Sequence, residues 1–167
     1  MEPDAHGLTV LPLLSGERGP GWSDRAGATI DGLTGATTPV ELLRAGLEAI
    51  ALQFAQIDAA LPGEQIVVAT GGGLVNSPAW TQIMADALGR PVAHSAVAEG
   101  SSRGAAVLAL EALGGRAGEA PLGETFEPDP AATAAYRAAL ERQQALYGTL
   151  VTSRPAPRPP GGPGSGR

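Results

Sequence analysis

A run of three glycines between a strand pattern and a helix pattern constrains this chain more than any other feature. The apolar residues 66–69 predict a short β-strand, and glycines 71–73 follow it almost directly. Ser77 is placed to cap the next helix, because Pro78 suits the first helical position. Such a turn lets a ligand approach the backbone closely, and a helix start offers free N–H groups to an anion.

The residues after this turn predict a helix and then a second strand. Gly89 ends the helix and Val92 begins the strand. Alternating strand and helix patterns after position 28 predict an α/β domain with a partly parallel sheet. One apolar face of the predicted helix contains Trp80, Ile83, Met84, Ala87 and Leu88.

The sequence at and around the glycine run does not match two common phosphate-binding motifs. The chain contains no lysine, so the lysine of a P-loop is absent. The spacing of a G-x-G-x-x-G dinucleotide fingerprint also fails, because no third glycine follows at the required position. Two interpretations stay open on this pattern alone: a nucleotide or phosphate site, and a tight strand-to-helix connection without a ligand.

The amino-acid composition argues against several kinds of binding partner and several kinds of site. The net charge is −6 with no basic cluster, which argues against nucleic acid and anionic membrane surfaces. There is no cysteine, so disulfides, thiolate zinc sites and thiol catalysis are excluded. No apolar run is long enough for a membrane span and the N-terminus lacks a basic signal region, so we expect a soluble, cytoplasmic protein.

The remaining segments predict an ordered domain over residues 1–150 and a disordered Pro/Gly/Arg-rich tail over 151–167. Thr38 and Glu41 form a predicted capping box for a long amphipathic helix that ends near Ala60. Further strands are predicted over 8–14, 28–33 and 91–93, further helices over 100–113 and 130–150, and a loop over 114–128.

Three charged positions invite a functional interpretation. Glu17 and Arg18 are either a functional pair or a local ion pair that holds their loop, and we expect the local pair. Arg44 and Glu48 are four residues apart on a helix, so we expect a surface pair. Glu99 precedes a helix, where capping is the expected role.

Four blocks of sequence, in order, resemble the C-terminal part of the FGGY carbohydrate kinases. That family includes gluconate, xylulose, ribulose and glycerol kinases and belongs to the actin-like ATPase superfamily. The glycine segment is similar to the family's adenosine-binding segment. The blocks are H-G-L-T-V-L-P-L-L-S-G-E-R (6–18), G-L-T with L-L-R-A-G-L-E-A-I-A (32–51), G-G-G-L-V-N-S-P-A-W-T-Q-I-M-A-D-A-L-G-R-P-V (71–92) and E-G-S-S-R-G-A-A-V-L (99–108).

The resemblance implies an α/β fold of the actin-like ATPase (ribonuclease H-like) type, namely the C-terminal half of an FGGY kinase lacking its first strands. It implies ATP with Mg²⁺ as cofactors and phosphorylation of a sugar or sugar-acid hydroxyl. Gly71, Gly72 and Gly73 are then expected to let the backbone approach the adenosine and α-phosphate. Ser77 is expected to contact adenine or to cap its helix.

The resemblance also implies what this part of the family lacks. The catalytic aspartate and the phosphate loops lie upstream in family members, so no residue here is assigned as catalytic or as a metal ligand. Asp31 and Asp86 are the carboxylates one would consider for the catalytic base, and a structural role is expected for Asp86. The partner implied is the N-terminal kinase half, and the first block is most similar to bacterial gluconate kinases.

Two alternatives remain beside an active carbohydrate kinase. The chain is either a truncated or non-catalytic nucleotide-binding fragment that is inactive alone, or an unrelated binding module in which all four blocks match by chance. Loss of the first strands would expose a sheet edge, which predicts association or poor solubility.

Overall fold

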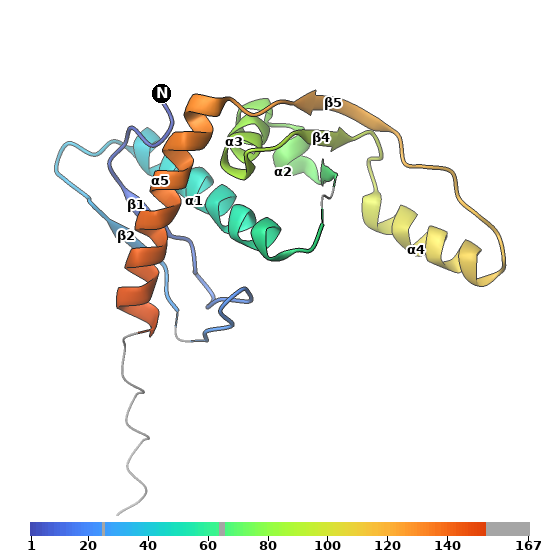
Figure 1. The fold of residues 1–167 in the computed structure, drawn as a ribbon, viewed down its shortest axis with the longest axis horizontal. Coiled ribbons are helices and arrows are strands. Elements are labelled where there is room, and N and C mark those ends of the chain that lie inside the picture. Colours follow the sequence, from blue (N-terminus) through green and yellow to red (C-terminus); the bar gives the residue numbers. More distant parts are fainter. Residues whose placement is uncertain (25, 64–65, 153–167) are drawn as a thin grey trace, which may run out of the picture.

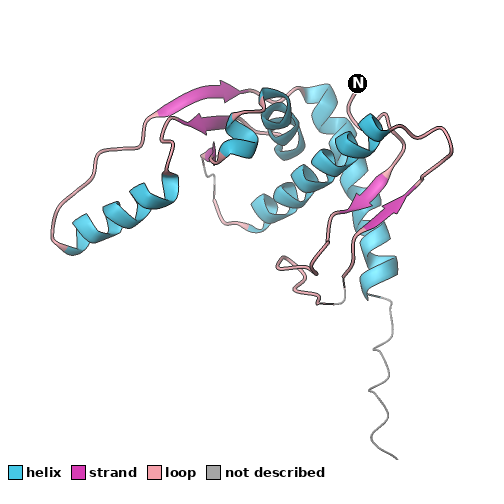
Figure 2. Cartoon of the chain, turned by 180° about the vertical axis from the view of Figure 1, so that it is seen from behind, coloured by secondary structure: helices cyan, strands magenta, loops and turns pink. Residues whose placement is uncertain are grey.

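The computed structural model describes residues 1–24, 26–63 and 66–152 (Figures 1 and 2). Nearly all predicted elements are present; the strands predicted over 8–14, 28–33 and 66–69 are shorter than expected, whereas the one predicted over 91–93 is one residue longer. In chain order they are β1 (Thr9–Leu11), β2 (Thr29–Asp31), α1 (Pro39–Ala60), β3 (Val67–Ala69), α2 (Gly72–Val75), α3 (Pro78–Leu88), β4 (Val92–Ser95), α4 (Gly100–Ala112), β5 (Leu122–Phe126), α5 (Pro130–Tyr147) and the π-helical turn η1 (Gly148–Thr152).

The described strands form two separate sheets. Strands β1 and β2 pair antiparallel, and a second sheet has the order β3-β4-β5. Strand β3 runs parallel to β4, with Val67 paired to Val92, so the predicted partly parallel sheet is confirmed. This parallel pair brings the carboxyl ends of β3 and β4 to the same edge.

Strand β5 corrects the expectation of a loop over residues 114–128. It pairs antiparallel with β4, with Phe126 opposite Val92. Its five residues, L-G-E-T-F, include a glycine and a glutamate, so their pattern does not alternate as a half-buried strand does. Pairing with β4, rather than local preference, therefore makes this segment a strand.

The main core lies where α1, α3 and α5 meet the inner face of β3 and β4. Helix α1 begins with the predicted capping box, in which Thr38 and Glu41 each accept a hydrogen bond from the other's backbone N–H. The predicted apolar face of α3 is confirmed. Ile83 and Met84 are buried in this core, and Trp80, Ala87 and Leu88 pack against it. The buried core residues are Ala51, Leu52, Ala69, Ile83, Met84, Ala85, Val92, Ala132, Tyr136 and Ala139.

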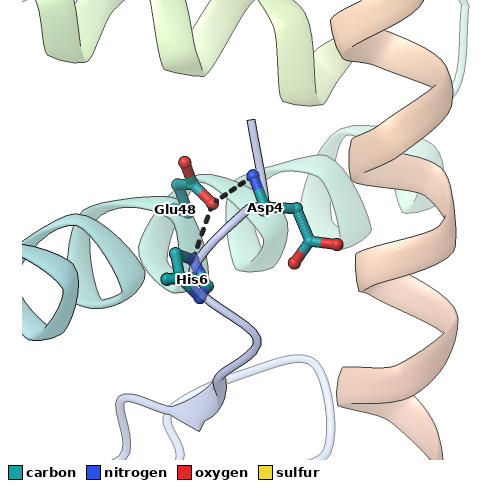
Figure 3. A group of neighbouring side chains, drawn as sticks. All are labelled: Asp4, His6 and Glu48. Atoms are coloured by element: carbon teal, nitrogen blue, oxygen red, sulfur yellow. Dashed lines mark hydrogen bonds and ion pairs between the residues drawn. The ribbon is translucent and has the colours of Figure 1, made fainter. Parts of the chain in front are cut away.

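Glu48, expected on the surface, is buried and joins three segments of the chain (Figure 3). One carboxylate oxygen accepts hydrogen bonds from the Asp4 backbone N–H at 3.2 Å and from His6 Nε2 at 3.0 Å. The other accepts from Arg44 Nε at 2.5 Å and from the Tyr136 hydroxyl at 3.0 Å. The Arg44–Glu48 pair therefore exists, but it is part of the interior rather than a surface pair.

Glu17 also differs from expectation. It is buried and accepts hydrogen bonds from the Tyr147 hydroxyl at 2.5 Å and from the Gly21 N–H at 3.0 Å. The ion pairs among the described residues do not include Glu17 with Arg18, which is exposed. The hydrogen bond to Glu17 raises the pKa of Tyr147 to about 12. Glu17 thus fastens its loop to the end of α5.

Helix α4 stands apart from the rest of the molecule in both views, joined to β4 and β5 by its two loops (Figures 1 and 2). None of its side chains is buried. After α5, η1 continues helical structure to Thr152 and so includes the first two residues of the expected tail, 151 and 152. The rest of that predicted disordered tail, 153–167, lies outside the described residues. Among the described residues, no helix has the length and apolarity needed to cross a membrane.

We predict that Glu48→Ala destabilises the protein strongly. The substitution leaves the Arg44 guanidinium and three further donors without their acceptor, and removal of one partner of a buried pair costs about 3–5 kcal/mol. Urea denaturation would measure the change in the free energy of unfolding. The matched control is Glu111→Ala on the exposed helix α4, which should change stability by less than about 0.5 kcal/mol. Equal effects of the two substitutions would contradict this role for Glu48.

Candidate nucleotide site

The turn after β3 depends on a glycine at position 71. Gly71 has φ +83° and ψ 153°, a conformation that is essentially restricted to glycine. A Cβ atom at Gly71 would meet no atom within 4 Å, so the backbone angle rather than crowding requires glycine. The chain then enters the four-residue helix α2, where only an open turn was expected.

The next two glycines let the backbone of this turn pack closely against the side chains of Asn76 and Trp80. A Cβ atom at Gly73 would lie 3.1 Å from Cζ3 of Trp80, and one at Gly72 would lie 3.3 Å from Nδ2 of Asn76. All three glycines are exposed. The backbone of residues 71–73 is therefore accessible to a molecule that approaches from solvent.

Ser77 caps α3, as the sequence predicted. Its hydroxyl oxygen accepts a hydrogen bond from the Trp80 N–H at 3.4 Å, while its own N–H donates to the Leu74 carbonyl at 2.9 Å. A hydroxyl that accepts in this way keeps its own proton available for another partner. Ser77 thus closes the connection between α2 and α3 at the edge of the glycine turn.

Two buried polar residues that sequence reasoning missed support the turn from below. The Thr81 hydroxyl lies 3.0 Å from the Leu74 carbonyl oxygen and 2.9 Å from Nε2 of His94, and the two side chains are 0% and 8% exposed. When His94 Nε2 donates to the Thr81 hydroxyl, that hydroxyl can donate its own proton to the Leu74 carbonyl. This arrangement gives a partner to the imidazole, the hydroxyl and the carbonyl. A lone threonine and a lone histidine 13 residues apart carry no local signal of this contact.

Trp80 fixes the same turn to α1. Its indole Nε1 donates to the Leu47 carbonyl oxygen at 3.3 Å, and its ring lies beneath Gly73. The turn is thus held on one side by α1, through Trp80, and on the other by β4, through His94.

The loop after β4 lies next to the glycine turn because β3 and β4 are parallel. A Cβ atom at Gly100, the first residue of α4, would lie 3.9 Å from Cγ2 of Thr70. Glu99 occupies the N-cap position of α4, but its side chain makes no capping hydrogen bond, so the expected capping contact is wrong. Ligands of parallel α/β sheets bind at such a carboxyl edge, between the loops of neighbouring strands.

The two remaining carboxylate candidates lie outside this edge. Asp86 accepts hydrogen bonds from Gln82 Nε2 and from the Asp129 N–H, both at 2.8 Å, which confirms the expected structural role. Asp129 in turn caps α5. Asp31 belongs to β2, in the other sheet.

Asp4, His6 and Glu48 are the one group of potential metal ligands found among the described residues, and their contacts do not fit a cation (Figure 3). The Leu8 N–H donates to His6 Nδ1 at 3.0 Å, so Nδ1 is an acceptor and Nε2 carries the proton given to Glu48. Glu48 already accepts four hydrogen bonds, and the Asp4 carboxylate pairs with Arg142. We therefore assign no Mg²⁺ ligand to these residues.

We predict that Thr81→Val lowers the free energy of unfolding by about 1–3 kcal/mol, because it leaves the buried Nε2 of His94 without its hydrogen-bond partner. Thr133→Val is the matched control, because the Thr133 hydroxyl is buried and has no hydrogen-bond partner. The Thr133→Val substitution should leave the free energy of unfolding unchanged or raise it. Chemical denaturation of both variants tests the contrast, and a Thr81→Val protein as stable as the parent would rule out the proposed support.

Comparison with known proteins identifies the family. The sequence model of the C-terminal domain of the FGGY family of carbohydrate kinases matches residues 1–113. The glycerol kinase of Acidovorax sp. (strain JS42) is 38% identical over 121 residues, covering 67% of this chain and 24% of that protein.

Solved structures agree over most of the chain. The xylulose kinase of Rhodospirillum rubrum is 38% identical with a TM-score of 0.75, covering 88% of this chain and 31% of that one. The gluconate kinase of Lactobacillus acidophilus, at 24% identity, shares the fold with a TM-score of 0.77 and covers 91% of this chain and 33% of that one. This chain thus spans about a quarter to a third of the length of these proteins. It belongs to the FGGY family of carbohydrate kinases and contains the C-terminal, actin-like α/β part of that fold.

Proposed function

We propose that this chain supplies the adenosine-binding part of a kinase that transfers phosphate from ATP to a hydroxyl group of a sugar or sugar acid. The observation that carries the proposal is the glycine turn at the carboxyl edge of a parallel strand pair, in a chain of this family. Gly71, Gly72 and Gly73 let the adenosine and α-phosphate approach the backbone, and Ser77 contacts adenine with the proton its capping role leaves free.

In the proposed reaction, the hydroxyl oxygen attacks the γ-phosphorus, the bond between that phosphorus and the β–γ bridging oxygen breaks, and ADP leaves. The proton of the hydroxyl passes to a general base, which the family resemblance places on an aspartate upstream of the matched part. Mg²⁺ bound with ATP would stabilise the negative charge of the transferred group, and we assign no residue of this chain as its ligand. In this proposal the chain holds and orients the nucleotide, and the N-terminal kinase half supplies the other residues of the active site.

Gluconate is the substrate we favour, because the first block, residues 6–18, is most similar to bacterial gluconate kinases. The second candidate function is a nucleotide-binding fragment that is inactive alone. It is favoured by the short share of the relatives' length that this chain spans. Adding a separately produced N-terminal half would distinguish the two functions. Restored turnover would support the kinase, and its absence would support the inactive fragment. We propose a cytoplasmic location for either function.

The first test is a thermal melt of the chain with and without Mg-ADP. A ligand that binds only the native state stabilises it, by about 2.7 kcal/mol at a concentration one hundred times its Kd. We expect a cooperative transition that millimolar Mg-ADP raises. A cooperative transition that is indifferent to Mg-ADP would contradict nucleotide binding by this chain alone.

We predict that Gly71→Ala removes most of the stabilisation by Mg-ADP. The alanine forces the backbone away from φ +83° and moves the turn that meets the nucleotide. The matched control is Gly114→Ala, at φ +80°, which also has no atom within 4 Å of its Cβ position and lies between α4 and β5. Each variant loses some stability by itself, so the quantity compared is the shift in Tm caused by Mg-ADP. The assignment fails if both variants keep the full shift.

A further inference from the structure

One cavity of the described structure has no part in the candidate nucleotide site. Its volume is about 260 Å³, which equals the share of roughly eight or nine water molecules in the liquid. Its walls come from β1, from the connection between β1 and β2, from the second half of α1 and from the last turns of α5. In both views α1 lies between that connection and the short helix α2 of the glycine turn (Figures 1 and 2). A ligand in this cavity therefore occupies a different side of the molecule from the nucleotide.

The cavity contains a carboxylate that is fixed in place. Glu17 is buried, and each of its two oxygens accepts one hydrogen bond, from the Tyr147 hydroxyl and from the Gly21 N–H. A Cβ atom at Gly21 would collide with both the Glu17 carboxylate and the Tyr147 hydroxyl, so glycine lets the loop close against this pair. An ionised carboxylate has about four lone-pair sites, so Glu17 can still accept hydrogen bonds from a ligand.

Glutamine side chains of α1 add both donors and acceptors to the wall. Gln53 is partly buried, and its amide has no hydrogen-bond partner among the described residues. Gln56 donates one N–H to Oε1 of Gln143 at 3.2 Å, so its own carbonyl oxygen and its second N–H stay available. Gln143 is itself held by the backbone carbonyls of Val10 and Ala49, at 2.8 and 3.2 Å. Amides that are partly buried but not fully paired are groups that a ligand can satisfy.

The charge of the lining excludes anionic ligands. The described lining contains no arginine or histidine, and the chain has no lysine. A phosphate or a carboxylate would therefore meet the negative charge of Glu17 without a cation to neutralise either group. Gluconate, the substrate favoured above, is excluded from this cavity for the same reason.

The mixture of donors and acceptors narrows the ligand further. An ammonium ion donates hydrogen bonds but accepts none, so it would leave the N–H groups of Gln53 and Gln56 unpaired. A hydroxyl group both donates and accepts, and can therefore pair with the carboxylate and with the amides. Leu11 and Pro20 give the cavity apolar surface for C–H groups, as small-molecule sites usually have. The lining as a whole suits an uncharged compound with several hydroxyl groups.

We propose that this cavity binds a neutral sugar or polyol of monosaccharide size, at a site separate from the glycine turn and from phosphate transfer. One ligand hydroxyl donates to Glu17, and others exchange hydrogen bonds with Gln53 and Gln56. The site goes beyond the proposed function, because it uses no residue assigned to the nucleotide and holds no group that reacts.

The test is an NMR titration of the ¹⁵N-labelled chain, without nucleotide, with D-glucose, D-xylose and xylitol as separate probes. We expect at least one of them to give saturable shifts of the Gly21 amide and of the side-chain amides of Gln53 and Gln56. D-Gluconate and methylammonium should bind there at least about tenfold more weakly than that probe. The proposal is overturned if none of the three neutral probes gives saturable shifts, or if the shifts are confined to the glycine turn. Equal binding of D-gluconate or of methylammonium at these residues also overturns it.

A pair of matched substitutions tests the wall. Gln53→Leu keeps the approximate size of the side chain and removes only an amide without a protein partner, so the fold is retained. It should raise the Kd of the neutral probe by at least about tenfold. The control is Gln82→Leu on α3, which changes another partly buried glutamine outside the cavity and should leave that Kd unchanged. The Kd of the folded protein is compared, because Gln82→Leu also removes two hydrogen bonds. An unchanged Kd in Gln53→Leu would refute the assignment.

The outcome is distinguishable from failure of the proposed function. These titrations contain no nucleotide, so a chain whose Tm is indifferent to Mg-ADP leaves the sugar result as it stands. A chain that binds Mg-ADP but none of the neutral probes keeps the proposed function and loses only this second site.

Discussion

The buried carboxylate of Glu48 is the contact on which the arrangement of the larger elements depends. It accepts hydrogen bonds from the N-terminal segment, from its own helix α1 and from α5. A buried anion is tolerated only where its lone pairs are satisfied, so these segments keep their positions together. Burial, and then the negative charge of Glu48, raise the pKa of Tyr136, which keeps that hydroxyl protonated as a donor. The result is a fixed frame of α1, α5 and the N-terminal segment that precedes β1.

A short series of contacts connects the glycine turn to that frame and holds it in place. Helix α1 receives the indole N–H of Trp80, and Trp80 lies beneath Gly73. On the other side, Thr81 joins the turn to His94 on β4. The turn has an exposed backbone but a rigid base, which is the combination that a preorganised binding site requires. The flexibility that glycine allows is thus confined to the surface that faces solvent.

Local chemistry in the sequence was enough to predict most elements and the form of the turn. Thr38 with Glu41, and Ser77 with Pro78, mark helix starts through side chains within three residues, so those boundaries were predicted well. Strand β5 and the partners of Glu17 and Glu48 were not predicted. They depend on residues far away in the chain, such as Tyr147 and Tyr136, whose proximity only the packed fold creates. Within the candidate site the glycines and the Ser77 cap were evident for the same local reason, whereas the Thr81–His94 contact was not.

The placement of Gly100 beside Thr70 has a consequence for the space next to the glycine turn. The first residue of α4 lies next to the residue that enters the glycine turn, so whatever orients α4 also sets one wall of the space beside that turn. Seating of this helix and occupation of that space are then linked equilibria. Because coupling free energies are reciprocal, each event changes the equilibrium constant of the other by the same factor.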